Sequence, residues 1–281
     1  MQSLSLTGAP QKTAGREFWN SNPCGGQWVN YRQFLTWYQS VEPYMFETLA
    51  RQSWHGRRVL EVGCGQGALV NHLGPLGARI VGMDMSDASL RRAAEGKKEL
   101  GNHTVNLMQA DAEKLPFADA SFDAVVSFGV LHHTPDTDGA VQEVRRVVKP
   151  GGTATVMLYR TGNPKWWATS VLRWYGRARD RRRAARDSIA DRARETHGVN
   201  DSRGTALLEL FGVPTLKAYS NHEAREMFRG FSQVEIHNVQ PGFLRLSDIL
   251  PWLRPAAPIL GWIDRRFAGV WGFYQVIEAK R

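Results

Sequence analysis

Short runs of consecutive apolar residues alternate with amphipathic stretches from residue 57 to residue 160. The runs predict strands covered on both faces, because a strand with one exposed face would alternate apolar and polar residues. The amphipathic stretches predict helices after residue 67, over 86–100 and over 138–148, the last ended by Lys149-Pro150-Gly151-Gly152. Together they predict a doubly wound parallel α/β sheet. Its first five strands are expected at residues 58–62, 79–83, 105–109, 122–128 and 153–158.

This rhythm stops near residue 160 and returns near residue 220. Residues 161–219 are rich in arginine and tryptophan, and we expect them to form an inserted basic lobe. Ser220 and Glu223 then match a capping box that opens a helix over 223–228. Two further strands, which would complete a seven-stranded sheet, are expected at residues 232–239 and 271–279.

The first 55 residues carry too many aromatic side chains for a solvated tail. We expect residues 1–55 to form a helical lid and residues 56–281 to form the main domain, with the insertion at 161–219. The aromatic residues of the lid are Trp19, Trp28, Tyr31, Phe34, Trp37, Tyr38, Tyr44 and Phe46.

Length and composition limit the size of the core, the kind of partner and the cellular compartment. Its 281 residues, 42% of them hydrophobic, can bury one large core or one core with a modest lobe. The net charge of +9 favours an anionic partner, such as a membrane surface, a nucleic acid or an acidic small molecule. Cys24 and Cys64 lie far apart, which fits a reducing compartment. No stretch approaches the ~20 apolar residues that span a bilayer, and residues 1–15 lack the apolar core of an export signal, so we expect a cytoplasmic protein.

Residues 59–67 read VLEVGCGQG, an apolar run followed by glycines at alternate positions. Glycine tolerates positive φ and leaves the backbone bare, and the helix that follows would turn its N-terminal amides toward a ligand. Gly63, Gly65 and Gly67 therefore predict a ligand-binding turn next to Glu61. The same stretch fits the looser dinucleotide pattern, so an NAD(P) site is an alternative.

Acidic residues follow the next two strands, Asp84 after the second and Asp111 after the third. Because the carboxyl ends of parallel strands meet at one edge of a sheet, both carboxylates are expected beside the glycine turn. The two oxygens of Asp84 can accept hydrogen bonds from both hydroxyls of a ribose. Asp84 therefore predicts an adenosine-type ligand, which nicotinamide cofactors share.

As a set, residues 59–152 resemble the class I S-adenosylmethionine-dependent methyltransferases, of the group that includes the ubiquinone and menaquinone methyltransferases. The resemblance implies a Rossmann-like seven-stranded sheet with an antiparallel last strand, and S-adenosylmethionine as cofactor. It implies that the glycine turn holds the methionine end, that the second-strand acid holds the ribose, and that the residues after the third strand bind the adenine. No metal is implied. The implied cofactor-binding residues are Glu61, Gly63, Cys64, Gly65, Gly67, Asp84, Met85, Asp111, Ala112, Phe128 and Gly129.

The sulfonium of that cofactor is already activated, so the protein must chiefly align the acceptor and exclude water. An oxygen or carbon acceptor also needs a base, and His132 and His133 follow the fourth strand beside the expected methyl position. We take His133 as the first candidate, because a helix is expected to begin just after it, and His132 as the second. The alternative is that both only shape the pocket. Tyr159 is a further polar candidate or a wall residue.

The acceptor is expected to be a small molecule. No Asn-Pro-Pro-Tyr or Asp-Pro-Pro-Tyr follows the fourth strand, which argues against methylation of exocyclic amines on DNA bases or glutamine. The aromatic side chains of residues 1–55 would suit a lipophilic or aromatic acceptor, although they would serve equally well as core packing.

Between residues 173 and 194, nine arginines stand against three aspartates. Just upstream, Trp167, Val171, Trp174 and Tyr175 fall on one face of a helix. Such an element can lie in an anionic membrane interface, with residues 246–267 as a second contact. The alternatives are a solvated arginine helix that packs on its own domain and an RNA-binding segment.

Three functional hypotheses follow. The first is methyl transfer from S-adenosylmethionine to a small lipophilic or aromatic acceptor, by a cytoplasmic enzyme peripheral to the inner face of the membrane. The second is an NAD(P)-dependent oxidoreductase on the same fold. The third is a catalytically inactive, membrane- or RNA-associated binding protein.

Overall fold

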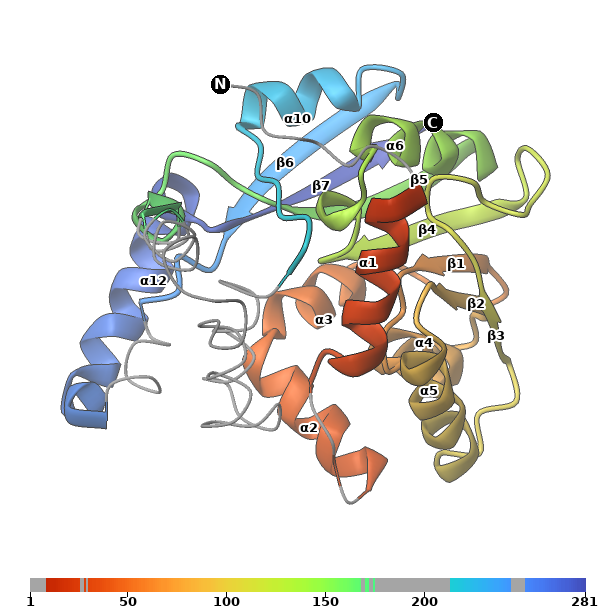
Figure 1. The fold of residues 1–281 in the computed structure, drawn as a ribbon, viewed down its shortest axis with the longest axis horizontal. Coiled ribbons are helices and arrows are strands. Elements are labelled where there is room, and N and C mark those ends of the chain that lie inside the picture. The colour runs from red at the N-terminus through yellow and green to blue at the C-terminus, as the bar shows by residue number, and fades with distance from the viewer. Residues whose placement is uncertain are drawn as a thin grey trace.

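The computed structural model describes residues 9–25, 28, 30–167, 170, 171, 174, 213–243 and 251–281. They contain a seven-stranded sheet in the order β3-β2-β1-β4-β5-β7-β6, which confirms the predicted α/β fold (Figure 1). Strands β1 to β5 pair in parallel, whereas β7 runs antiparallel to both of its neighbours. The strands are β1 (Arg58–Val62), β2 (Arg79–Asp84), β3 (Val105–Gln109), β4 (Phe122–Phe128), β5 (Val148–Tyr159), β6 (Gln233–Val239) and β7 (Tyr274–Lys280).

β2 and β6 differ from their predicted bounds by one residue, and β5 and β7 differ by more. β5 begins at Val148 rather than after the glycines, because Val148 pairs with Phe122 across an irregular register and Gly151 donates its amide to the Arg281 carbonyl at 2.7 Å. β7 begins at Tyr274, because the preceding residues up to Trp271 end a helix that the sequence did not predict.

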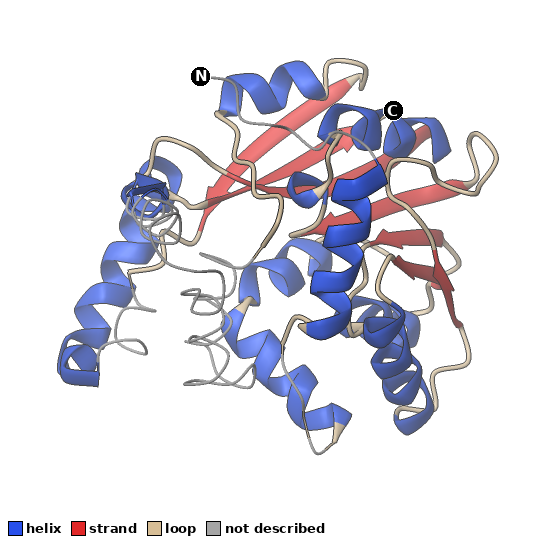
Figure 2. Cartoon of the chain, in the orientation of Figure 1, coloured by secondary structure: helices blue, strands red, loops and turns tan. Residues whose placement is uncertain are grey.

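Helices cover both faces of the sheet (Figure 2). The capping box of Ser220 and Glu223 is present as predicted. The helix predicted over 138–148 begins one residue earlier, where the side chain of Asp136 accepts a hydrogen bond from the Gly139 amide. The helices are α1 (Ala9–Ser21), α2 (Tyr31–Val41), α3 (Pro43–Ala50), α4 (Ala68–Leu73), α5 (Asp87–Glu99), α6 (Thr137–Val147), α10 (Asn221–Met227) and α12 (Ala257–Trp271), with 3-10 turns η1 (Gly74–Leu76), η2 (Leu131–His133) and η3 (Pro251–Ala256).

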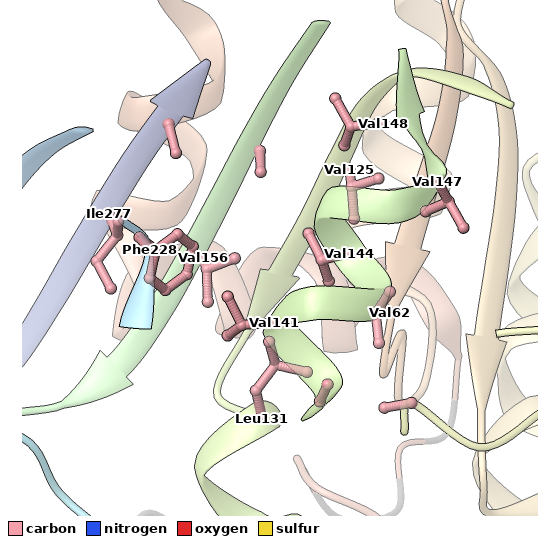
Figure 3. Close-up of a cluster of buried hydrophobic side chains, with 14 of the residues drawn as sticks. Val62, Val125, Leu131, Val141, Val144, Val147, Val148, Val156, Phe228 and Ile277 are labelled. Carbon is pink, nitrogen blue, oxygen red and sulfur yellow. The ribbon is translucent and has the colours of Figure 1, made fainter. Parts of the chain in front are cut away.

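Alternate residues of the strands point to opposite faces of the sheet, where they form two hydrophobic cores. Leu60 and Val62 of β1 pack with α6 and α10 on one face. Figure 3 labels Val62 of this core together with Val141, Val144 and Val147 of α6. Val59, the residue before Leu60, packs with α3 and α4 on the other face. The three β1 side chains have no exposed surface, and burial of such a side chain contributes about 1.5–3 kcal/mol. The two cores hold the carboxyl ends of the parallel strands in a fixed register.

Helix α12 is fastened to the β6 edge of the sheet through its last turns. The side-chain amide of Asn238 donates to the Gly269 backbone carbonyl at 2.9 Å. The guanidinium of Arg160 donates to the Val270 carbonyl at 2.8 Å, where a cation also favours the helix dipole. From there α12 extends outward at the side of the molecule opposite β3 (Figure 1).

Candidate functional site

The register of the parallel strands gathers the predicted site residues at one edge. Glu61 of β1 pairs with Gly82 of β2 and with Val126 of β4. Asp84, the last residue of β2, pairs with Gln109, the last residue of β3. The acids that follow these strands therefore leave the sheet at the same edge as the glycine turn.

The glycine turn closes tightly at one end and opens at the other. Gly63 has a φ of 74°, and a Cβ there would lie 2.2 Å from a methyl group of Val130, so this position excludes every other residue. Gly65 has a φ of 52°, and a Cβ there would meet nothing within 4 Å. The turn thus presents bare backbone to open space at Gly65, as a ligand-binding turn requires.

Asp84 fastens this turn to helix α5. Its Oδ2 accepts the amide of Gly65 and its Oδ1 accepts the amide of Ser86, both at 2.8 Å. Burial raises the pKa of Asp84, and the backbone donors oppose that rise. Each carboxylate oxygen keeps a second lone pair, so the side chain can accept further hydrogen bonds while it holds the turn.

Glu61 is buried at the start of the turn, with 4% of its surface exposed. Burial raises the pKa of Glu61 well above its ordinary value, and the Val70 amide in the first turn of α4 lowers it in part. Its Oε2 is buried and has no hydrogen-bond partner among the described residues. A buried carboxylate of this kind favours a neighbouring positive charge.

Asp111 accepts the ammonium group of Lys12 on its Oδ2 at 2.6 Å and the amide of Glu113 on its Oδ1 at 2.9 Å. The same ammonium lies 2.6 Å from the Glu113 carboxylate. Although burial favours the neutral amine, the hydrogen bonds to both acids raise the pKa of Lys12. Lys12 was absent from the sequence prediction, because no local pattern marks a contact across 99 residues.

Helix α1 lies across the carboxyl edge of the sheet. Beyond Lys12, the backbone carbonyl of Trp19 accepts the hydroxyl of Ser86 at 3.2 Å. The Trp19 ring packs edge-on against the ring of His133, with centroids 5.4 Å apart. Gly15 faces Met85, whose methyl group lies 4.0 Å from the position of a Cβ at that glycine. One helix thus reaches from the end of β3 to the turn after β4.

The two histidines after β4 have different environments. His132 has no exposed surface, and burial and the nearby His133 lower its pKa well below the ordinary value. His133 is half-buried, and its Nδ1 lies 2.8 Å from the Thr215 carbonyl oxygen. Because a carbonyl can only accept, Nδ1 carries the proton in the neutral ring, and the lone pair is on Nε2. The sequence did not reveal Thr215, which is distant along the chain.

Aromatic rings surround this histidine pair. The ring centroid of Tyr159 lies 4.0 Å from that of His132 and 5.4 Å from that of Tyr274. Tyr44 of α3 stacks on Tyr274 at 5.3 Å, and its hydroxyl is buried without a hydrogen-bond partner among the described residues. Tyr44 and Trp19 thus bring the aromatic N-terminal segment into contact with the strand ends.

The remaining predicted residues lie around the same edge. Cys64 is buried, and burial raises the pKa of its thiol well above the ordinary value, so the thiol stays protonated. The backbone carbonyl of Met85 accepts a hydrogen bond from the side-chain amide of Gln109 at 2.9 Å. Ala112, which follows Asp111, is buried. Phe128 ends β4, and Gly129 follows it with a φ of 74°.

Residues 60–156 match the family model described as a methyltransferase domain. The ubiquinone biosynthesis O-methyltransferase of Paracidovorax citrulli is 40% identical over 34% of this chain and 41% of its own length. The demethylmenaquinone methyltransferase of Geobacillus stearothermophilus is 35% identical over 44% of this chain and 52% of its own length. The chain thus spans about half or less of these relatives.

The similarity to solved structures extends over more of the chain. An S-adenosylmethionine-dependent methyltransferase from Mesorhizobium loti aligns with a TM-score of 0.53 and 18% identity, over 85% of this chain and 96% of that one. At this identity the alignment establishes the fold, which is the Rossmann-like fold of these methyltransferases. In the part of the chain that the structure describes, no helix is both long and apolar enough to cross a membrane.

Proposed function

We propose that the chain transfers a methyl group from S-adenosylmethionine to a small lipophilic or aromatic acceptor. The observation that carries the proposal is the buried, unpartnered Oε2 of Glu61 beside a turn whose backbone is open at Gly65. S-adenosylmethionine, when bound, supplies an activated methyl group on a positively charged sulfonium. Glu61 would hold the positive methionine end, and its own unfavourable burial would be offset by that charge.

The other residues at the edge complete the cofactor site in this proposal. Asp84 would accept the ribose hydroxyls while it holds the turn through Gly65 and Ser86. Asp111 and the Ala112 amide would bind the adenine, Met85 would pack on its ring, and the backbone at 128–129 would face the cofactor amine.

His133 is the general base of the proposal for an oxygen or carbon acceptor. The contact with Thr215 places the lone pair on Nε2, which would take the proton of the acceptor as the methyl group is transferred. His132 has no exposed atom, so it would pack behind His133 rather than touch the acceptor. Trp19 and Tyr159 beside the ring would exclude water.

A lipophilic or aromatic acceptor is supported by the rings of Trp19, Tyr44, Tyr159 and Tyr274 around the histidines. The names of the two relatives point the same way, because both refer to quinone biosynthesis. Such an acceptor would reside in a membrane, so the proposal includes a cytoplasmic enzyme in peripheral contact with an anionic bilayer. The nine arginines of the stretch at 173–194 lie outside the described residues.

The strand order favours this proposal over an NAD(P)-dependent oxidoreductase. Dinucleotide-binding sheets place a sixth parallel strand beside the fifth. Here the antiparallel β7 lies between β5 and β6.

Calorimetry of the purified chain with S-adenosylhomocysteine and with NADH tests the proposal. We expect binding of S-adenosylhomocysteine alone. Binding of NADH alone would replace the proposal with the oxidoreductase, and binding of neither would favour an inactive binding protein. Mass spectrometry of metabolites from cells fed isotopically labelled methionine, with and without the gene, would then identify the acceptor.

A further inference from the structure

The exposed large apolar side chains of this protein are concentrated in two short segments. Eight such side chains occur in the described residues, and seven of them lie in residues 167–174 and 252–270, whereas Leu76 lies elsewhere. Isolated exposed apolar residues are ordinary, but a concentration of this kind marks a surface that contacts an apolar partner. The seven are Trp167, Val171, Trp174, Trp252, Ile259, Trp262 and Val270, which we call the tryptophan surface.

Helix α12 provides the clearest part of this surface. Ile259, Trp262 and Val270 are 63%, 55% and 63% exposed, and their spacing places them on one side of the helix. The opposite side already has partners. There the ring of Trp271 packs edge-on against that of Phe243 at 5.9 Å, and Asp264 accepts the amide of Phe243 at 2.8 Å. The exposed side is therefore a second apolar side, beyond the one that folding uses.

The second segment adjoins the end of α12. Residues 164–167, 170, 171 and 174 are helical, and among them Trp167, Val171 and Trp174 are 62%, 63% and 70% exposed. Lys165, two residues before Trp167, lies with its ammonium group 3.9 Å from the ring centroid of Phe273, which is two residues beyond the end of α12. The two segments are thus neighbours through that contact.

Positive charge accompanies the apolar residues. Arg254, Arg265 and Arg266 are exposed, and Arg266 lies on the same side of α12 as Trp262. Asp264, the acidic residue of α12, has its carboxylate turned to Phe243. Tryptophan and arginine together are typical of segments that lie in the interface of an anionic bilayer, where the ring enters the headgroup region and the guanidinium meets the phosphates.

We infer that the tryptophan surface is a docking surface for an anionic lipid bilayer. α12 and η3 would lie in the headgroup region, with Trp252 and Trp262 inserted and the arginines at the phosphate level. The inference rests on the proposed function in one respect, which is the purpose of docking. An enzyme held at the bilayer reaches a lipophilic acceptor there. The exposure and the positive charge of the surface do not depend on the acceptor.

Co-sedimentation with vesicles tests this inference on the full chain. We expect binding to phosphatidylcholine vesicles that contain phosphatidylglycerol, and weak binding to phosphatidylcholine alone. The double variant Ile259→Glu/Trp262→Glu should bind the anionic vesicles at least about tenfold more weakly, because each change places a carboxylate in the interface. Leu76→Glu is the matched control, since Leu76 is also exposed, at 47%, but lies outside the tryptophan surface. It should bind as the parent does.

A second double variant tests how much the arginines contribute to vesicle binding. Arg265→Gln/Arg266→Gln should weaken binding to anionic vesicles several-fold and reduce its sensitivity to salt. Calorimetry with S-adenosylhomocysteine on all variants should give an unchanged affinity, which shows that they are folded and separates the two proposals. A chain that binds vesicles but no S-adenosylhomocysteine would overturn the proposed function and leave the docking surface intact.

Three results would overturn the docking surface. The first is equal vesicle binding by the parent and the Ile259→Glu/Trp262→Glu variant. The second is absence of vesicle binding with salt-sensitive binding of RNA, which would assign the charge to nucleic acid. The third is a dimer that the same double variant converts to a monomer without any vesicle binding, which would assign the surface to a second copy of the chain.

Discussion

The ammonium group of Lys12 lies 2.6 Å from Asp111, and this contact joins the first described helix to the end of β3. Both side chains are partly exposed, at 31% and 41%, so the pair contributes at most about 1 kcal/mol. It nevertheless occupies an oxygen that the proposed adenine site would use. The pair is therefore placed to hold α1 over the site until a ligand competes for Asp111.

Replacement of Lys12 should speed ligand entry. We expect Lys12→Met to raise the association rate constant of S-adenosylhomocysteine by up to about fivefold, because the loss of a partly exposed ion pair makes α1 easier to displace. Stopped-flow fluorescence of the tryptophans measures this rate. Lys98→Met, at an exposed lysine of α5, is the control and should leave the rate unchanged. A slower association in Lys12→Met would mean that Lys12 guides the ligand instead of blocking it.

Asp84 should be the most sensitive acid of the cofactor site. Asp84→Ala is expected to weaken S-adenosylhomocysteine binding by roughly 1.5–3 kcal/mol, because charged hydrogen bonds to the ribose are lost. It also removes the acceptor of the Gly65 and Ser86 amides, so Asp84→Asn, which keeps an acceptor oxygen, should lose less. Titration calorimetry measures both, with Asp87→Asn on exposed α5 as control. An unchanged dissociation constant in Asp84→Ala would exclude Asp84 from the ligand site.

Glu61 should lower the stability of the cofactor-free chain and strengthen the binding of S-adenosylmethionine. Burial raises its folded pKa, so the cofactor-free chain loses stability as pH rises above the ordinary glutamate range near ~4.3. Glu61→Gln removes that loss, and we expect a Tm at pH 7 higher by about 2–4 °C, equivalent to about 1 kcal/mol. The same variant should bind S-adenosylmethionine at least about tenfold more weakly.

Calorimetry at several pH values, in parallel with ligand titration, measures both effects. Glu47→Gln, at an exposed position of α3, is the control and should change neither. A lower Tm in Glu61→Gln together with unchanged binding would show that the carboxylate serves the fold alone.

His133 should affect turnover more than binding. His133→Gln is expected to lower the rate of methyl transfer by about 10²–10⁴-fold while the affinity for S-adenosylhomocysteine stays the same, because a positioned base is lost. Single-turnover kinetics with the identified acceptor measures the rate. A full rate in this variant would make His133 a wall residue of the pocket.

His132 should make the fold sensitive to acid. Its folded pKa is lowered by burial, so the unfolded chain binds its proton first and stability falls as pH drops below ~6.5. His132→Phe should flatten this fall, because the ring keeps its packing with Tyr159 but cannot take a proton. Denaturant titrations at pH 5 and pH 7.5 measure the difference, and His103→Phe at an exposed site is the control. Parallel pH profiles in parent and His132→Phe would contradict this assignment.

The sequence predicted those parts of the fold that depend on neighbouring residues. The bounds of β1, β3 and β4 were predicted correctly, since each is a short segment made mostly of apolar residues. The capping box at Ser220 was equally local. Helix α12 was missed because three prolines precede it or lie within its first turn, and its apolar residues point both inward and outward.

Some residues of the candidate site could likewise be predicted from the sequence, and others could not. Gly63, Gly65, Asp84 and Asp111 could be recognised, because the topology of a parallel sheet brings strand ends together wherever they lie in the chain. Lys12 and Thr215 could not, because nothing in their local sequence specifies the residues that they contact. Their partners Asp111 and His133 are 99 and 82 residues away.

The position of β7 has a consequence for biosynthesis. β6 is complete at Val239, yet the strand that connects it to the rest of the sheet begins only at Tyr274. While the chain emerges from the ribosome, the backbone groups of β6 and the outer side of β5 therefore stay unpaired until those final residues arrive. This interval is the stage at which a nascent chain of this topology is most prone to aggregate, and a chaperone that shields strand edges would act there.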